Sequence, residues 1–189
     1  MGRSSFFATG SDCCIDAIRP MNEINAPICT DYNYCELTSD QFIQIMPLSH
    51  MLDAHMAASP TFMPRPPDTE LSFVAKAVRY YCSFFAAKKG GKVIAFAGVA
   101  HGGETFACEV SGYTHITTGA YCLPEHRGKG VFQNLMNFVI STLSIEGYTR
   151  FGVDFESINP NAYGFWLKYL NAYAHSVVRR IDEGAILEL

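Results

Sequence analysis

Apolar residues recur at every second position in some stretches of the chain and at every third or fourth position in others. The first spacing is typical of a strand with one buried face, and the second is typical of an amphipathic helix. The alternating stretches predict strands over residues 33–37, 92–100, 104–111, 113–123, 151–156 and 174–181. The helical spacing predicts helices over residues 39–52, 71–81, 131–143 and 160–170.

Glycine turns join three of the predicted strands. Gly90-Gly91, Gly102-Gly103 and Gly112 each stand directly before an alternating stretch. Short turns of this kind connect antiparallel neighbours. We therefore predict an α/β (α+β) fold with a mixed, mostly antiparallel central sheet and helices on both of its faces.

The N-terminal part of the chain has no steady period. We treat residues 1–30 as an extension of unknown role and residues 31–189 as the folded domain. Within the extension we predict a short helix over residues 11–19, which Pro20 would end.

Composition narrows the class of protein. The chain has 189 residues, of which 49% are hydrophobic and 17% charged, so it is long and apolar enough to fold as one domain. Its net charge of -4 argues against general nucleic-acid binding. The seven cysteines lack the spacing of metal ligands, and no apolar run reaches the roughly 18 residues of a membrane span. We expect a cytoplasmic protein with no metal, no nucleic-acid partner and no membrane partner.

The most informative motif lies over residues 123–132, where a strand ends, a glycine-rich turn follows and a helix begins. The first turn of a helix has N–H groups without backbone acceptors. Gly128 and Gly130 let a ligand approach the backbone closely, and Arg127 and Lys129 add positive charge. These features predict a site for a phosphate or diphosphate. The alternative is an ordinary strand-to-helix turn with exposed basic residues.

This motif resembles the central motif of the GNAT superfamily of acyl-CoA-dependent N-acetyltransferases, [RQ]-x-x-G-x-[GA]. Residues 127–131 match its first five positions, and Phe132 replaces the final Gly or Ala. The second family motif, N-x-x-A-x-x-F-Y-x-K, has Trp166 in place of its tyrosine. The positions that match it are Asn159, Ala162, Phe165 and Lys168.

The resemblance implies a fold in which two parallel strands, over residues 113–123 and 151–156, separate at one end. The pantetheine arm of acetyl-CoA would lie between them. Three groups of residues would bind this cofactor: the backbone of Tyr121, Cys122 and Leu123 at the arm, the turn Arg127, Gly128, Lys129, Gly130, Val131 and Phe132 at the diphosphate, and Asn159, Ala162 and Phe165 on the next helix.

The resemblance also implies direct attack of an amine on the thioester in a ternary complex. The reaction needs a base for the ammonium and an acid for the leaving thiolate. Because Trp166 stands in the tyrosine position, Tyr169 becomes the candidate acid. The candidate bases are Glu156, His115 and Glu109.

Alternatives to this activity stay open. One is a non-catalytic acyl-CoA sensor, which Phe132 and Trp166 would suit, and another is a structural protein whose turn binds nothing. A covalent route through Cys122 would need a nearby base and is unusual for this fold. The acceptor would be an amine of unidentified structure bound near residues 40–80, and a homodimer is the candidate assembly. That segment contains Met46, Met51, Met56 and Met63.

Overall fold

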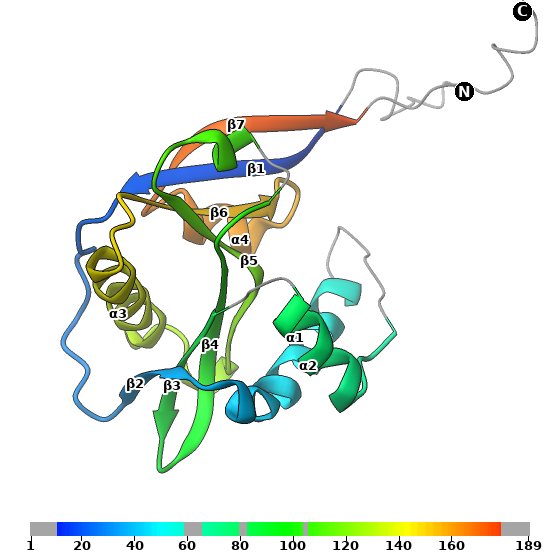
Figure 1. Cartoon of the computed structure of the whole chain (residues 1–189), viewed down its shortest axis with the longest axis vertical. Helices are drawn as coiled ribbons and strands as arrows, with labels where there is room; N and C mark the ends of the chain where they lie inside the picture. Colours follow the sequence, from blue (N-terminus) through cyan, green and yellow to red (C-terminus); the bar gives the residue numbers. More distant parts are fainter. Residues whose placement is uncertain (1–10, 59–65, 80–82, 104–105, 179–189) are drawn as a thin grey trace, which may run out of the picture.

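The computed structural model describes residues 11–58, 66–79, 83–103 and 106–178, which build a seven-stranded sheet in the order β2-β3-β4-β5-β6-β1-β7 (Figure 1). Only the β5–β6 pair is parallel, so the predicted mixed, mostly antiparallel sheet is confirmed. The strands are β1 (Ser11–Pro20), β2 (Asn33–Leu37), β3 (Ser83–Lys89), β4 (Lys92–Ala100), β5 (Tyr113–Cys122), β6 (Arg150–Glu156) and β7 (Asn171–Val178).

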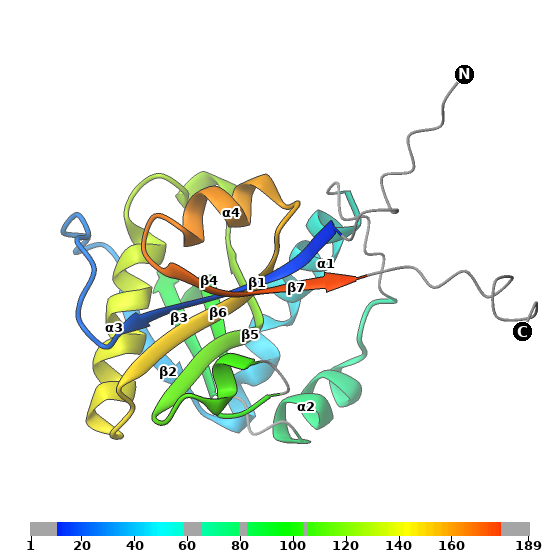
Figure 2. The same ribbon diagram turned by 90° about the horizontal axis from the view of Figure 1, so that it is seen from above.

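Helices cover both faces of the sheet, as predicted (Figures 1 and 2). Helix α3 lies on one face, whereas η1, α1 and α2 lie on the other. Within the described residues, no helix combines the length and apolar character needed to cross a membrane. The helices are η1 (Ser39–Ile45), α1 (Met46–Ala58), α2 (Glu70–Arg79), η2 (Phe106–Glu109), η3 (Pro124–His126), α3 (Val131–Ile145) and α4 (Pro160–Trp166).

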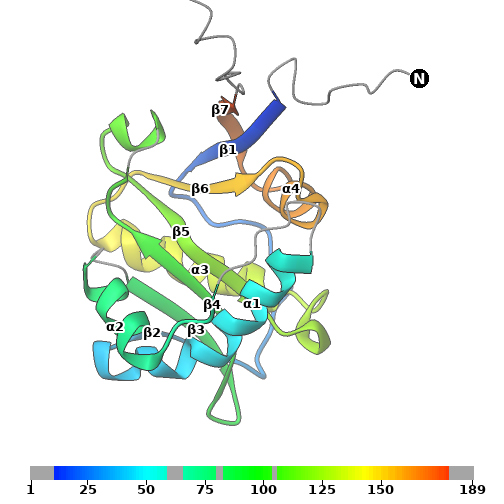
Figure 3. The same ribbon diagram turned by 90° about the vertical axis from the view of Figure 1, so that its right-hand side faces the viewer.

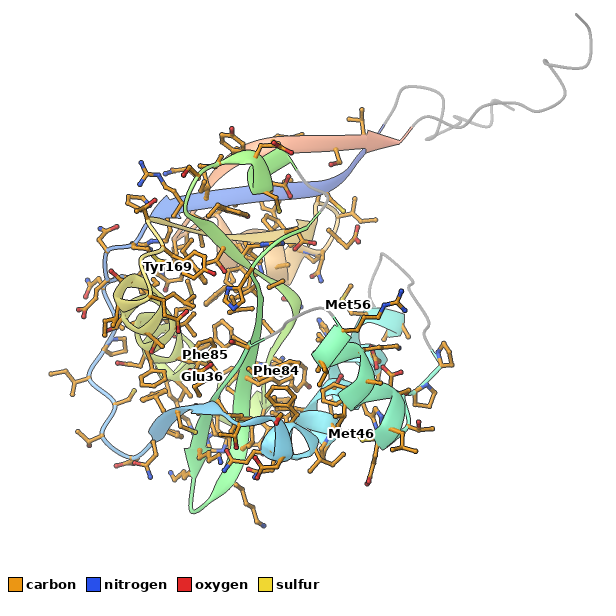
Figure 4. The ribbon with its side chains drawn as sticks, in the orientation of Figure 1. Glu36, Met46, Met56, Phe84, Phe85 and Tyr169 are labelled. Atoms are coloured by element: carbon orange, nitrogen blue, oxygen red, sulfur yellow. The ribbon has the colours of Figure 1, made fainter. Side chains whose placement is uncertain are left out.

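Strand β3 carries side chains into both layers. Phe84 and Phe85 are neighbours in the chain and point to opposite faces of the sheet (Figure 4). Phe84 contacts Phe42 and Phe73 on the α1–α2 side, and Phe85 contacts Phe138 of α3. Because residues on both faces of this strand are buried, its sequence does not alternate between apolar and polar positions, and β3 was not predicted.

Strand β1 corrects the prediction of a helix over residues 11–19. It lies between β6 and β7 and pairs antiparallel with both. Ile15 and Ala17 join the core beneath α3, and Asp16 on the opposite face is also buried, with 3% of its surface exposed. A buried polar residue between buried apolar ones hides the alternation that marks a strand.

Two other predictions are wrong in part. A strand is predicted over residues 104–111, but within the described part of this stretch Phe106–Glu109 forms the short helix η2. The last strand begins at Asn171 rather than at residue 174. Its predicted end, residues 179–181, lies outside the described residues.

Residues 21–32, which we call the N-terminal strap, run from β1 along α3 to β2 (Figure 1). The backbone N–H of Ile24 donates to Asn137 Oδ1 at 2.8 Å, and Asn137 Nδ2 donates back to the Ile24 carbonyl at 2.9 Å. Asn134 Nδ2 donates to the Pro27 carbonyl at 2.7 Å. The strap is therefore bonded to the first half of α3.

Candidate active site

Strands β5 and β6 separate at one end and leave a cavity of about 1060 Å³ between them. They pair from Tyr113–Arg150 to Ile116–Val153 and no further. Helices α1 and α4 flank this opening (Figure 3). The predicted site residues that line the cavity are Tyr121, Cys122, Arg127, Gly128, Val131, Phe132, Glu156, Asn159, Ala162, Phe165 and Tyr169.

The glycine-rich turn has the geometry of an anion site. Gly128 and Gly130 have φ of 72° and 77°, a region that side chains rarely adopt. The first backbone bond of α3 runs from the N–H of Asn134 to the carbonyl of Gly130, at 3.0 Å. The N–H groups of residues 131–133 therefore have no acceptor within the helix and are available to a phosphate.

The two glycines of the turn face different surroundings. A side chain at Gly128 would meet nothing within 4 Å, whereas a side chain at Gly130 would collide with the ring of Pro27 in the N-terminal strap. Cys29, also in the strap, donates from Sγ to the Lys129 carbonyl at 2.8 Å. One side of the turn is thus open to a ligand, and the other is packed against the strap.

The two cations of the turn bond to nearby carbonyl groups. Arg127 Nε donates to the Cys122 carbonyl at 2.8 Å, and its guanidinium lies 5.1 Å from the centre of the Tyr121 ring. Lys129 Nζ donates to the Glu125 carbonyl at 2.7 Å. Arg127 lines the cavity and Lys129 does not, so Arg127 is the cation placed to meet an anion there.

The register of β5 corrects two of the predicted backbone contacts with the cofactor, those of Leu123 and Tyr121. The N–H of Leu123 donates to the Ile94 carbonyl at 2.9 Å, so this N–H is used by β4. Backbone groups alternate in direction along an antiparallel strand. Tyr121 therefore also directs its backbone groups to β4, whereas Ala120 and Cys122 direct theirs to the gap beside β6.

Phe132 and Trp166, the two residues that depart from the family motifs, contact each other. The rings of Phe132 and Trp166 are 5.9 Å apart in an edge-to-face arrangement, and Phe165 lies 5.5 Å from Phe132. Trp166 is buried, with 7% of its surface exposed. Phe132 is thus turned toward α4, where it packs with the residue that replaces the family's tyrosine.

Asn159 caps α4 and also lines the cavity. Its Oδ1 accepts from the N–H groups of Asn161 and Ala162, at 3.2 and 3.3 Å, so it caps α4. It also lines the cavity, and its Nδ2 lies 3.8 Å from the sulfur of Met56 in α1. This contact links the helices on the two sides of the opening.

Tyr169 lies beside α3 (Figure 4). Its hydroxyl accepts a hydrogen bond from Gln133 Nε2 at 3.3 Å, and Gln133 belongs to the first turn of that helix. Its ring contacts Phe165 at 5.2 Å. The hydroxyl is thus directed toward the end of α3 that has the geometry of an anion site. The role of Tyr169 as the acid stays a prediction.

The three candidate bases lie in different places. Glu156 lines the cavity, whereas Glu109 is exposed in η2 and is not part of the lining. His115 is 2% exposed and does not reach the cavity. Its Nε2 lies 3.9 Å from Asp154 Oδ1, and burial lowers the pKa of His115, so the neutral ring is favoured.

Asp154 lines the cavity and was not among the predicted site residues. It shares with Glu156 the face of β6 opposite Val153 and Phe155, which pack beneath α3. The alternation of β6 could have identified Asp154, because it lies two residues before Glu156 and therefore on the same face of the strand.

The side of the cavity where the acceptor is predicted to bind is formed mainly by α1 and the segment before α2. Met56 lines it, whereas Met46 and Met51 do not, and Met46 lies at the far end of α1 (Figure 4). Met63 is outside the described residues. Polar residues from this side are Ser49, Asp53, His55, Asp68 and Lys76. In the described part of the chain, no three His, Cys, Asp or Glu residues are grouped so as to hold a metal ion.

Several solved structures that are similar in shape to this chain are acetyltransferases. Aminoglycoside N-acetyltransferase AAC(6')-Iy in complex with CoA is 15% identical, with a TM-score of 0.63 over 84% of this chain and 99% of that chain. An aminoglycoside acetyltransferase from an uncultured soil metagenomic sample is 11% identical, with a TM-score of 0.61 over 82% and 98% of the two chains. Ribosomal-protein-alanine N-acetyltransferase from Brucella melitensis is 15% identical, with a TM-score of 0.55 over 80% and 99%.

At these identities the structures establish the fold. No curated protein matches the sequence significantly. The model of the acetyltransferase (GNAT) family matches residues 49–171, which include most of α1, the glycine-rich turn and α4. That segment is well over half of the chain, and the chain therefore belongs to the GNAT family of acetyltransferases.

Proposed function

We propose that this protein transfers an acetyl group from acetyl-CoA to a primary amine, with both substrates bound in the cavity at once. The observation that carries the proposal is the continuity of that cavity. It extends from the open N–H groups at the start of α3 to the acidic face of β6. One site can therefore bind a diphosphate at one end and an ammonium group at the other.

The residues present fit the donor. The turn at Gly128 and the first N–H groups of α3 would bind the diphosphate, with Arg127 at the rim. The backbone groups of Ala120 and the N–H of Cys122 would bond to the pantetheine arm, as those of another strand would, whereas the Cys122 carbonyl already accepts from Arg127. Asn159 and Phe165 would line its other side. When bound, acetyl-CoA supplies the thioester that is open to attack.

The acceptor must lose a proton before it can attack. Asp154 and Glu156 are the carboxylates of β6 that line the cavity, and either could accept that proton. The amine lone pair then forms a bond to the carbonyl carbon, and the carbon–sulfur bond breaks. The thiolate leaves with that electron pair and would take its proton from solvent, because the Tyr169 hydroxyl is directed toward the start of α3 and Trp166 has no acidic hydroxyl to donate.

The charge of the acceptor side favours a cationic amine. Asp53, Asp154 and Glu156 line the cavity, and Lys76 on the same side is paired with Asp68 at 2.6 Å. Carboxylates that line a cavity attract ammonium groups. Two of the similar structures are aminoglycoside acetyltransferases, which agrees with such an acceptor. We further propose a cytoplasmic enzyme that acts as a homodimer.

Release of free CoA tests the activity. We would incubate the protein with acetyl-CoA and, separately, spermidine, sisomicin and a peptide with N-terminal alanine. Turnover with at least one amine is expected, and faster turnover with the two polyamines would support a cationic acceptor. Release that is equal with and without amine would contradict the acetyltransferase proposal.

The second candidate is an acyl-CoA sensor without turnover, favoured by Trp166 in the tyrosine position. Thermal unfolding separates the two. A ligand at about 100 times its Kd adds roughly 2.7 kcal/mol of stability, which raises Tm by about 5–10 °C at this chain length. Stabilisation by acetyl-CoA but not by NAD, without turnover, would identify a sensor.

A further inference from the structure

A group of buried polar side chains lies behind the acidic face of the cavity. We call Asp16, Tyr113, His115 and Asp154 the buried polar cluster. Asp16, Tyr113 and His115 are 3%, 7% and 2% exposed, whereas the side chain of Asp154 is 31% exposed and lines the cavity. Asp154 is thus the member of the cluster that a bound amine can reach.

The strand register brings these residues together. Asp16 of β1 stands directly opposite Asp154 of β6, so both carboxylates lie on one face of the sheet. On β5, Tyr113 stacks on His115 with ring centres 5.2 Å apart. A side chain at Gly152 would collide with the Tyr113 ring, so this glycine makes room for the cluster.

The cluster is costly to bury. The backbone N–H of Ala107 donates to Asp16, but His115 Nδ1 and the Tyr113 hydroxyl have no hydrogen-bond partner. Burial, with Asp154 nearby, raises the pKa of Asp16, and burial lowers the pKa of His115. Polar groups buried without full satisfaction destabilise a fold. Their presence next to a cavity therefore points to a role in chemistry.

Asp154 also occupies the innermost position of the opening. It is the first residue of β6 after the parallel pairing ends at Val153. From Cys122 at the outer end of β5 to Ile116 at the inner end, the gap is roughly 20 Å long at a strand's rise per residue. A donor whose diphosphate lies at the turn would direct its thioester inward, toward Asp154. Glu156 lies two residues nearer the mouth.

We propose that Asp154 is the general base of the acetyl transfer and that Asp16 and His115 are positioning residues behind it, so that the N-terminal strand completes the active site. This inference rests on the proposed function. The ammonium N–H bond breaks and an O–H bond forms on Asp154. The freed lone pair attacks the thioester carbon, and the electrons of the carbon–sulfur bond leave with sulfur.

His115 and Asp16 would stabilise the protonated state of the base. His115 Nε2 lies 3.9 Å from Asp154 Oδ1, which is beyond hydrogen-bond distance, so its effect on the base would be electrostatic. The carboxylate of Asp16, directly opposite Asp154 in the sheet, would favour a proton on that base. The other titratable groups that face His115 and its neighbours are Tyr113 of β5, Cys108 of η2 and His101 after β4. Asp16 precedes the family-matched segment, so a family motif could not have supplied it.

Isosteric variants measured with acetyl-CoA and the fastest amine of the panel test the assignment. D154N should lower kcat by about 100-fold or more. D16N should lower kcat on the order of tenfold, about 1.4 kcal/mol, with little change in KM for the amine. The matched control is E36Q, an exposed acid on the far edge strand β2 (Figure 4), which should leave the rate unchanged. A large loss in E156Q with a normal rate in D154N would overturn the proposal.

Titration of His115 by NMR gives a readout that needs no turnover. Because the charge of Asp16 raises the pKa of His115, this pKa should fall in D16N and stay unchanged in E36Q. An unchanged value in D16N would overturn the role of Asp16. Stabilisation by acetyl-CoA confirms that each variant is folded. Absence of wild-type turnover contradicts the proposed function, whereas wild-type turnover with a fully active D154N contradicts only this inference.

Discussion

The ring of Pro27 lies so close to the Cα of Gly130 that no side chain fits between them. Pro27 belongs to the N-terminal strap, and Gly130 is the N-cap residue directly before α3. The strap is held there by hydrogen bonds from Asn134 and Asn137. The turn that would bind the diphosphate is thus supported from behind by a segment about 100 residues away in the chain.

This contact predicts different effects for two similar substitutions. Both Gly128 and Gly130 have a left-handed backbone, so alanine at either position should cost about 1–2 kcal/mol of unfolding free energy. Gly130→Ala should cost roughly 1–3 kcal/mol more, because the new methyl group would collide with Pro27. Urea unfolding of both variants measures the difference. Equal losses of unfolding free energy in the two variants would show that Pro27 does not restrict the space at Gly130.

Arg127 should contribute to donor binding more than Lys129 does. Only Arg127 of the two lines the cavity, and a charge-assisted hydrogen bond to phosphate contributes about 1.5–3 kcal/mol. Arg127→Ala should therefore weaken acetyl-CoA binding by about tenfold or more. Lys129→Ala is the matched control and should have a small effect. Calorimetric titration with acetyl-CoA measures both, and a larger loss for the lysine variant would be inconsistent with this geometry.

Cys122 should not act as a nucleophile. Burial raises the pKa of its thiol to about 11, so at pH 8 only about one molecule in a thousand carries the thiolate. Cys122→Ala should keep kcat within a few-fold of wild type. Mass spectrometry after incubation with acetyl-CoA should find no acetyl group on this residue. Rapid acetylation of Cys122, together with loss of turnover in the variant, would instead indicate a covalent route.

The buried histidine predicts a dependence of stability on pH. Because burial lowers the pKa of His115 in the folded state, folding favours the neutral ring. Its contribution to stability is complete above the unfolded pKa, about 6.5, and is lost as the pH falls through the folded pKa. The variant His115→Gln should therefore lose less stability than wild type between pH 7.5 and 5.5. Urea unfolding at both values is the measurement, and identical losses in both proteins would refute the expected linkage.

The sequence predicted the part of the fold that contains the glycine-rich turn. Strand β5, helix α3, strand β6 and helix α4 each have a clear period and a clear end, and the family assignment built on their motifs is confirmed. Those signals are local, so one sequence is enough to find them. The chemical roles of the individual residues stay predictions.

The missed features depend on contacts between distant residues. Strand β1 was taken for a helix because Asp16 and Arg19 are buried polar residues in an otherwise apolar strand. Asp154 has no local sequence signal that separates it from a solvent-facing acid, and only the neighbouring strands β1 and β5 show that it stands beside buried groups. The contact between Pro27 and Gly130 has no sequence signature, since proline and glycine occur in turns for many other reasons.

The position of β1 between β6 and β7 also constrains how the protein is made. Of the described elements this strand is the first to be synthesised, whereas its two partners are among the last. The sheet can close only after β6 and β7 have been made, and contacts this distant in sequence form slowly. Until then the apolar face of β1 needs a temporary partner, so we expect the nascent chain to depend on chaperones.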